Sequence, residues 1–262
     1  MPKKEHFLDI GRAADYNKLN EKVHLIFKAL PTEQVGFLRK RNALMSIKGF
    51  IFDLDGTLAD TLPELNRAMN KTRARFGLAP IGRTEVLRGI NDGPRNFVLR
   101  TFPEDTDEAT IDAATNFYIS DYETEYMNTK TAFPGMQETI RQMKRDGCKT
   151  AVLTNKAHRA AVLLVEQIFG KDVFSPLWGV RDVPLKPAPE AALKIAEIFG
   201  LPPSEICFVG DSHIDMQTGK NAGMHTIGVS YGYKSAEVLL QNGAEAIADT
   251  PEKIYEIAKK IG

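Results

Sequence analysis

A short apolar run, Phe50 to Phe52, is followed directly by two aspartates, Asp53 and Asp55, and by Gly56. The run is long enough for a buried strand and too short for a helix. On extended backbone, acids at positions i and i+2 project to the same side, and Gly56 allows a sharp turn just beyond them. Carboxylates at the end of a buried strand are costly unless a cation or hydrogen bonds compensate them. The stretch therefore predicts either a charged site or a pair of solvated turn aspartates, and the rest of the chain decides between the two.

The composition allows a large folded core and does not indicate a nucleic acid or a membrane as partner. The chain has 262 residues, enough for one domain with an insertion or for two domains. Lysine plus arginine and aspartate plus glutamate both number 34, so the charge balance indicates neither a nucleic acid nor an anionic membrane as partner. No apolar run approaches the ~20 residues of a membrane span, and Met1–Leu8 lacks the apolar core of a signal peptide.

Two cysteines bear on the compartment. Cys148 and Cys207 lie in apolar, strand-like runs, so we expect both to be reduced thiols of the core. A reducing, cytoplasmic location fits this expectation. We expect the protein to be a monomer or a homodimer.

Residues 1–44 are predicted to form a helical N-terminal extension. Apolar residues from Val23 to Leu30 follow helical spacing, Pro31 interrupts them, and Thr32 is a candidate cap of a second helix. The segment has nine basic and five acidic residues. Three alternatives follow: a helical hairpin packed on the main domain, a basic docking arm, or an addition with no part in the chemistry.

Residues 62–132 are predicted to form a small all-helical insertion. Thr61 and Pro63 mark the start of its first helix. Glycine, asparagine and proline gather over 88–95, which predicts a loop. The next helix is long, and we expect its stripe to pack in the core and not to form a ligand site; the stripe consists of Ile111, Tyr118, Tyr122 and Tyr126.

From Phe133 onward, strand and helix patterns alternate. Together with the run at 50–52, the predicted strands are Cys148–Leu153, Phe174–Trp178, Ile206–Val209, His225–Val229 and Ala246–Ala248. Helices are expected near 137–146, 157–169, 188–199, 213–222, 235–242 and 251–261. Such alternation predicts an α/β fold, an open parallel sheet with helices on both faces in a Rossmann-like core. The core would comprise 45–61 and 133–262, with 62–132 inserted between them.

Polar side chains follow the predicted strands at the edge where such sheets bind ligands. Asp53 and Asp55 come after the first run, Thr154 and Asn155 after the second, and Asp211 and Asp215 after Ile206–Val209. Lys186 precedes a proline, which restricts it to extended backbone. Several carboxylates, a hydroxyl and a lysine at one edge predict a site for a divalent metal and a phosphate. Ligands that are all oxygen favour Mg²⁺ over zinc.

Four short motifs, in this order, resemble those of the haloacid dehalogenase superfamily. They are Asp53-Leu54-Asp55-Gly56-Thr57-Leu58, Thr154-Asn155, Lys186-Pro187 and Gly210-Asp211-Ser212-x-x-Asp215. The resemblance covers residues 46–262 and, through Phe133–Met136 and Gly228–Tyr233, extends to the phosphoglycolate phosphatase-like branch. The helical insertion is similar to the mobile cap of that branch, whereas 1–44 has no counterpart.

The resemblance implies a Mg²⁺-dependent phosphatase acting on a small phosphorylated metabolite. Asp53 would be the nucleophile that forms an aspartyl-phosphate, and Asp55 the general acid and base. Asp53, the Asp55 backbone carbonyl and Asp211 would hold the metal, with Asp215 as a direct or more distant ligand.

Phosphate binding and specificity follow from the same resemblance. Thr154, the Asn155 backbone and Lys186 would hold the phosphoryl oxygens. Phosphoglycolate is the first candidate substrate. Arg88 or Arg95, in the cap loop, would meet a carboxylate or second phosphate on the substrate; the alternative is that both are surface residues. His158 is expected at a helix start, outside the chemistry.

Other functions stay open at this point. The same scaffold could serve a phosphomutase similar to β-phosphoglucomutase, which needs a base in the cap, or a pyrophosphatase. From a different class, a non-enzymatic phospho-acceptor switch also uses acids, a hydroxyl and a lysine. The second acid at i+2, the insertion and the chain length favour an enzyme over the switch.

Overall fold

The computed structural model describes residues 47–125 and 131–261, which belong to one compact unit. The predicted extension over 1–44 and the predicted core residue Tyr126 lie outside the described residues. No helix within the described part is long and apolar enough to cross a membrane.

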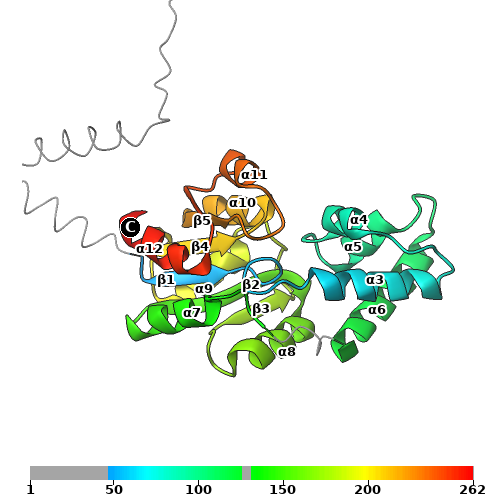
Figure 1. Cartoon of the computed structure of the whole chain (residues 1–262), viewed down its shortest axis with the longest axis horizontal. Coiled ribbons are helices and arrows are strands. Elements are labelled where there is room, and N and C mark those ends of the chain that lie inside the picture. Colours follow the sequence, from blue (N-terminus) through cyan, green and yellow to red (C-terminus); the bar gives the residue numbers. More distant parts are fainter. Residues whose placement is uncertain (1–46, 126–130, 262) are drawn as a thin grey trace, which may run out of the picture. The chain divides into compact units, whose positions relative to one another are not determined.

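Six parallel strands form one sheet in the order β3-β2-β1-β4-β5-β6 (Figure 1). Their bounds are β1 Gly49–Phe52, β2 Lys149–Ala157, β3 Leu177–Val180, β4 Ile206–Gly210, β5 His225–Val229 and β6 Ala246–Ala248. β1 lies at the centre and pairs with β2 on one side and β4 on the other. The three strands expected to carry polar groups are therefore neighbours, and their carboxyl ends meet at one edge of the sheet.

Helices cover both faces of the sheet, as the α/β alternation predicts. The helices of this core are α7 Met136–Arg145, α8 His158–Phe169, α9 Glu190–Phe199, α10 His213–Asn221, α11 Ala236–Gln241 and α12 Pro251–Ile261, with a short 3₁₀ turn η2 at Pro203–Glu205. Side chains alternate along β1: Phe50 and Phe52 pack in a cluster with α7, α8 and α12, while Ile51 packs in another with α9. The fold class predicted from the sequence is confirmed.

The four described helices between β1 and α7 form an insertion, which stands beside the sheet at the right of Figure 1. Its helices are α3 Leu62–Arg75, α4 Arg83–Gly89, α5 Pro94–Thr101 and α6 Glu108–Glu125. They share a hydrophobic cluster, to which Ala160 of α8 also belongs. Ile111, Tyr118 and Tyr122 are buried in it, as the helical stripe predicts.

Two strands differ from the sequence prediction in ways that matter for the site. β2 continues to Ala157, so Thr154 and Asn155 lie within the strand and not after it. The pairing of β2 with β3 shifts register between Leu153 and Ala157 and then resumes. β3 begins after Pro176, which has no N–H to donate to a ladder.

Phe174, predicted within β3, lies instead in the preceding bend, where its ring packs against Phe52 and Phe169.

The two cysteines differ from each other in burial. Cys207 is a buried free thiol. Cys148, also a free thiol, precedes β2 and is half-buried, and it packs against the core cluster.

We expect Phe52→Ala to lower the unfolding free energy by about 3–5 kcal/mol, because it leaves a cavity at the centre of the sheet. Phe52 is fully buried, whereas Leu240 is 52% exposed, so Leu240→Ala should change stability by no more than about 0.5 kcal/mol. Urea denaturation of both variants measures the difference. Equal losses would contradict the assignment of β1 to the core.

Candidate active site

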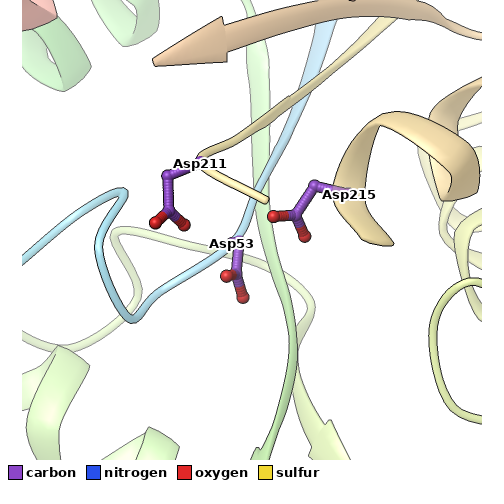
Figure 2. A group of neighbouring side chains, drawn as sticks. All are labelled: Asp53, Asp211 and Asp215. Atoms are coloured by element: carbon purple, nitrogen blue, oxygen red, sulfur yellow. The ribbon is translucent and has the colours of Figure 1, made fainter. Parts of the chain in front are cut away.

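Three buried aspartates meet at the carboxyl edge of the sheet (Figure 2). Asp53 follows β1, Asp211 follows β4, and Asp215 lies in the first turn of α10. One carboxylate oxygen from each lies within 4.8 Å of the others. The sequence predicted that these acids meet at one edge of the sheet, and the parallel pairing of β1 with β4 brings them together.

The turn after β1 is shaped to let these acids approach. The Leu54 carbonyl accepts hydrogen bonds from the backbone of Thr57, Leu58 and Ala59. Gly56 has φ +83°, and a Cβ there would lie 2.3 Å from the Asp211 carboxylate. Glycine is required at this position by both the backbone conformation and the close approach.

Asp211 and Asp215 are held by different donors. The Thr57 hydroxyl donates to Asp211 at 3.2 Å, and the Tyr233 backbone N–H donates to it at 2.8 Å. The Asp215 carboxylate accepts hydrogen bonds from the Ser212 backbone N–H at 3.0 Å and from the Ser212 hydroxyl at 2.6 Å. The Asp215 N–H donates to the Ser212 hydroxyl at 3.4 Å, which completes a capping box at the start of α10. Both acids are thus fixed before any ligand binds.

Lys186 is the cation among these acids. Its Nζ lies 2.8 Å from Asp53 and 2.6 Å from Asp215, and the residue is only 5% exposed. Its backbone is tied to Asn155: the Lys186 N–H donates to Asn155 Oδ1 at 3.0 Å, and Asn155 Nδ2 donates to the Lys186 carbonyl at 3.0 Å. Asn155 Nδ2 also donates to the carbonyl of Asn91 in the insertion at 2.8 Å. The Asn155 side chain therefore joins the sheet, the Lys186 loop and the insertion.

The charges of this cluster do not balance. Burial and then the charge of Asp215 raise the pKa of Asp53 to about 6, although Lys186 opposes the shift. Burial and the charges of Asp215 and Asp53 raise the pKa of Asp211 well above its usual range. Burial alone would lower the pKa of Lys186, but the charges of Asp215 and Asp53 outweigh it and raise that pKa. Three carboxylates and one ammonium leave an excess of negative charge, which a divalent cation with oxygen ligands fits.

Asp55 has a separate set of partners. Lys156 Nζ lies 2.9 Å and 3.1 Å from its two oxygens, and the Thr61 hydroxyl donates to it at 2.5 Å. Thr61 was expected to cap α3, but its side chain makes no cap hydrogen bond and is used here instead. The Lys156 ammonium also lies 4.1 Å from the centre of the Tyr122 ring of α6. Asp55 is held at the junction of core and insertion.

A pocket between the insertion and the sheet edge connects these groups. Its lining includes the predicted site residues Asp53, Asp55, Thr154, Asn155 and Lys186. Asp211 and Asp215 lie close to Asp53 but do not line the pocket. Site residues from the first three motifs therefore border one opening, and those of the fourth motif reach it through their contact with Asp53 and Lys186.

The two arginines proposed for specificity lie elsewhere. Arg88 is exposed and is not among the lining residues. Arg95 is exposed and forms ion pairs with Glu108 and Asp112. The structure supports their alternative interpretation as surface residues of the insertion. His158 is the first residue of α8, as predicted.

Some residues of the site were missed at the sequence level. Lys156 follows Thr154 at spacing i+2 on a strand, so both side chains project to the same side; this signal was available. Tyr118 and Tyr122 are core residues, as predicted. They also line the pocket, so the prediction that they take no part in a ligand site is not supported. Helical periodicity does not distinguish a buried side chain from one that also faces a cavity.

Comparison with known proteins identifies the group to which the chain is related. The model of the haloacid dehalogenase-like hydrolases matches residues 50–229. The chain belongs to this family. A phosphoglycolate phosphatase of Chromobacterium violaceum is 30% identical over 221 residues, which cover 82% of this chain and 98% of that protein. One from Pseudomonas putida is 32% identical over 189 residues, or 70% of this chain and 69% of that protein.

A solved structure is also similar to this chain in fold. The crystal structure of a predicted phosphoglycolate phosphatase from Haemophilus somnus has a TM-score of 0.75 and 27% identity, covering 80% of this chain and 97% of that one. The predicted resemblance to the superfamily and its phosphoglycolate phosphatase-like branch is confirmed. Membership and the relatives' names also confirm the prediction of an enzyme, a hydrolase of the phosphatase kind.

We expect Asp53→Asn to stabilise the metal-free protein relative to wild type, and increasingly so as pH rises from about 4 to about 7. The raised pKa of Asp53 means that the folded state holds its proton more tightly than the unfolded state. Stability from this group is therefore complete below the unfolded pKa and is lost as pH rises through about 6, by roughly 3 kcal/mol for a shift of this size. Urea denaturation in EDTA at several pH values measures the difference. The exposed Asp182→Asn is the control; a gap between Asp53→Asn and wild type that does not widen with pH would contradict the electrostatic account.

Proposed function

We propose that this chain is a Mg²⁺-dependent phosphatase that hydrolyses a small phosphomonoester through an aspartyl-phosphate on Asp53. The main support is one arrangement: Asp53 lies among Asp211, Asp215 and Lys186 at the inner end of a pocket that also contains Asp55. Family membership and relatives named phosphoglycolate phosphatase favour the same chemistry. Phosphoglycolate is the substrate that those names suggest.

Mg²⁺ would be held by Asp53, Asp211 and the backbone carbonyl of Asp55. The oxygens of Asp215 already accept hydrogen bonds from Lys186 and Ser212, so we propose that Asp215 contributes mainly charge and the position of Lys186. When bound, the ion would offset the repulsion between Asp53 and an anionic phosphate and favour the ionised nucleophile.

The reaction has two steps in this proposal. A carboxylate oxygen of Asp53 attacks phosphorus, the P–O bond to the organic group breaks, and Asp55 gives its proton to the departing oxygen. A water then attacks the phosphorus of the aspartyl-phosphate and gives a proton to Asp55. The bond between phosphorus and Asp53 breaks, inorganic phosphate leaves, and both acids return to their initial states.

Thr154, the Asn155 backbone and Lys186 would bind the phosphoryl oxygens. Lys186 can do so because it is held between Asp53 and Asp215 at hydrogen-bond distance from both. Fixed donors aimed at developing charge are the main source of catalysis in phosphoryl transfer. The Asn155 side chain, by contrast, is used to hold the Lys186 loop.

The insertion would act as a cap that closes over the substrate and excludes water. In this proposal, residues 45–61 and 133–262 form the core domain and residues 62–132 form the cap. Among the described residues that line the pocket, the titratable groups are two acids, two lysines and two tyrosines. Since the cap contributes no histidine or acid to them, hydrolysis is favoured over a phosphomutase. A cytoplasmic location and a monomer or homodimer remain predictions from sequence.

The proposed function is tested by phosphate release from a panel of phosphomonoesters, pyrophosphate and nucleotides, with Mg²⁺ or with EDTA. We expect release from at least one monoester in Mg²⁺ and none in EDTA. Asp53→Asn should reduce turnover by at least about 10³-fold, because the nucleophile is lost, while its circular dichroism spectrum stays that of the wild type. Asp182→Asn, a matched change at an exposed site, should keep wild-type turnover. Full activity of Asp53→Asn would exclude Asp53 as nucleophile.

Asp55→Asn should slow both steps, each by about 10²–10⁴-fold, since both transfer a proton through this side chain. Rapid-quench kinetics with a ³²P-labelled monoester separates formation of the phosphoenzyme from its decay. Unimpaired formation and decay in Asp55→Asn would show that the acid and base role is wrong.

A further inference from the structure

The walls of the pocket differ sharply in charge between the core and the insertion. The core contributes Asp53, Asp55, Lys156 and Lys186 to the lining. The insertion contributes no charged side chain: the larger groups on its side are Leu65, Ile90, Phe97, Tyr118, Ile119 and Tyr122. A phosphate held by the core would therefore direct its organic group at an uncharged, largely apolar wall.

Both lysines of the lining are already paired. Lys186 contacts Asp53 and Asp215, and Lys156 contacts both oxygens of Asp55. Among the lining residues in the described part of the chain there is no arginine. An anionic group on the organic part of a substrate would have no cation of its own.

The arginines near the lining in sequence lie outside it. Arg67, two residues after Leu65, is half-buried, and its charge acts on Tyr122, where it opposes the rise in pKa. Arg159, next to Ala160, pairs with Glu123. Arg95 pairs with Glu108 and Asp112, and Arg100 pairs with Asp92. Arg88, in α4, is exposed outside the lining. None of these arginines lines the pocket.

The tyrosines cannot replace a cation, although each offers a hydroxyl. Burial raises the pKa of both Tyr118 and Tyr122 far above 10, so both phenols are neutral. A carboxylate or second phosphate moved from water to this wall would lose its hydration without gaining an ion pair, which is costly. An apolar group of the same size would gain from burial against the same side chains.

We propose that the substrate of this chain is the phosphomonoester of a small branched-alkyl or aromatic alcohol that carries no second charge. The proposal rests on the proposed phosphatase function and deepens it. It distinguishes this chain from enzymes whose substrate bears a carboxylate beside the phosphate, as phosphoglycolate does.

The sharpest test compares ligands of equal shape and different charge. 3-Methylbutylphosphonate and 3-phosphonopropionate have the same number of heavy atoms in the same branching pattern, and neither can be hydrolysed at a P–C bond. Isothermal titration calorimetry in Mg²⁺ should give at least about tenfold tighter binding of the apolar phosphonate, the size of effect that a few buried methyl groups produce. Equal or tighter binding of 3-phosphonopropionate would overturn the proposal.

A matched pair of variants adds a cation inside or outside the pocket. Ile119 lines the pocket and is half-exposed, so Ile119→Arg can be accommodated. It should shift the ratio of the two dissociation constants by at least about tenfold toward 3-phosphonopropionate. Leu99→Arg places the same charge on the exposed surface of α5 and should leave the ratio unchanged. Equal ratios in all three proteins would contradict the role of the wall.

Turnover separates this inference from the proposed function. Isobutyl phosphate and phosphoglycolate are the corresponding isosteric monoesters, and kcat/KM should favour isobutyl phosphate. If phosphoglycolate is preferred while Asp53→Asn is inactive, the phosphatase function holds and the inference is wrong. If neither these nor any other monoester releases phosphate, the proposed function fails, and the calorimetric comparison still decides the preference of the pocket.

Discussion

The candidate site depends on one buried cation shared between two acids. Lys186 lies at 2.8 Å from Asp53 and 2.6 Å from Asp215, away from bulk water. Removing Lys186 would be costly, because it would leave Asp53 and Asp215 buried without a cation. The turn at Gly56, the cap of α10 at Ser212 and the Asn155 amide all serve to keep these groups in place. The geometry is therefore established by the fold itself.

Much of this arrangement could be predicted from the sequence because of one topological rule. Polar residues at the carboxyl ends of adjacent parallel strands lie close together, so Asp53, Asp55 and Asp211 could be assigned to one edge without coordinates. Lys186 lies in a loop beyond β3 and was assigned from its motif. Asp215 followed from its place one helical turn after Asp211. The end of β2 was predicted four residues too early, because the sequence does not reveal that pairing with β3 resumes after a register shift beyond Leu153.

The rest could not be predicted because it depends on side-chain direction and on distant partners. Nothing in the loop sequence shows that Arg95 turns to Glu108 and Asp112, which lie on another helix. Lys156 pairs with an acid 101 positions earlier, so local patterns could not assign its partner. For Tyr118 and Tyr122, the apolar stripe correctly predicted burial but carried no information on the cavity that they border. Specificity is the least predictable property because it depends on such contacts.

In the proposed mechanism, the placement of Lys156 would link the proton transfers of Asp55 to any movement of the insertion. Its ammonium is in contact with a carboxylate of the core and with the face of the Tyr122 ring in α6 at the same time. Any hinge motion that carries α6 from the sheet removes the ring and admits solvent around the ion pair, and water weakens its attraction. In that proposal, the surroundings of the Asp55 carboxylate would differ between an open and a closed insertion, because the ring of Tyr122 shields the ion pair only in the closed form.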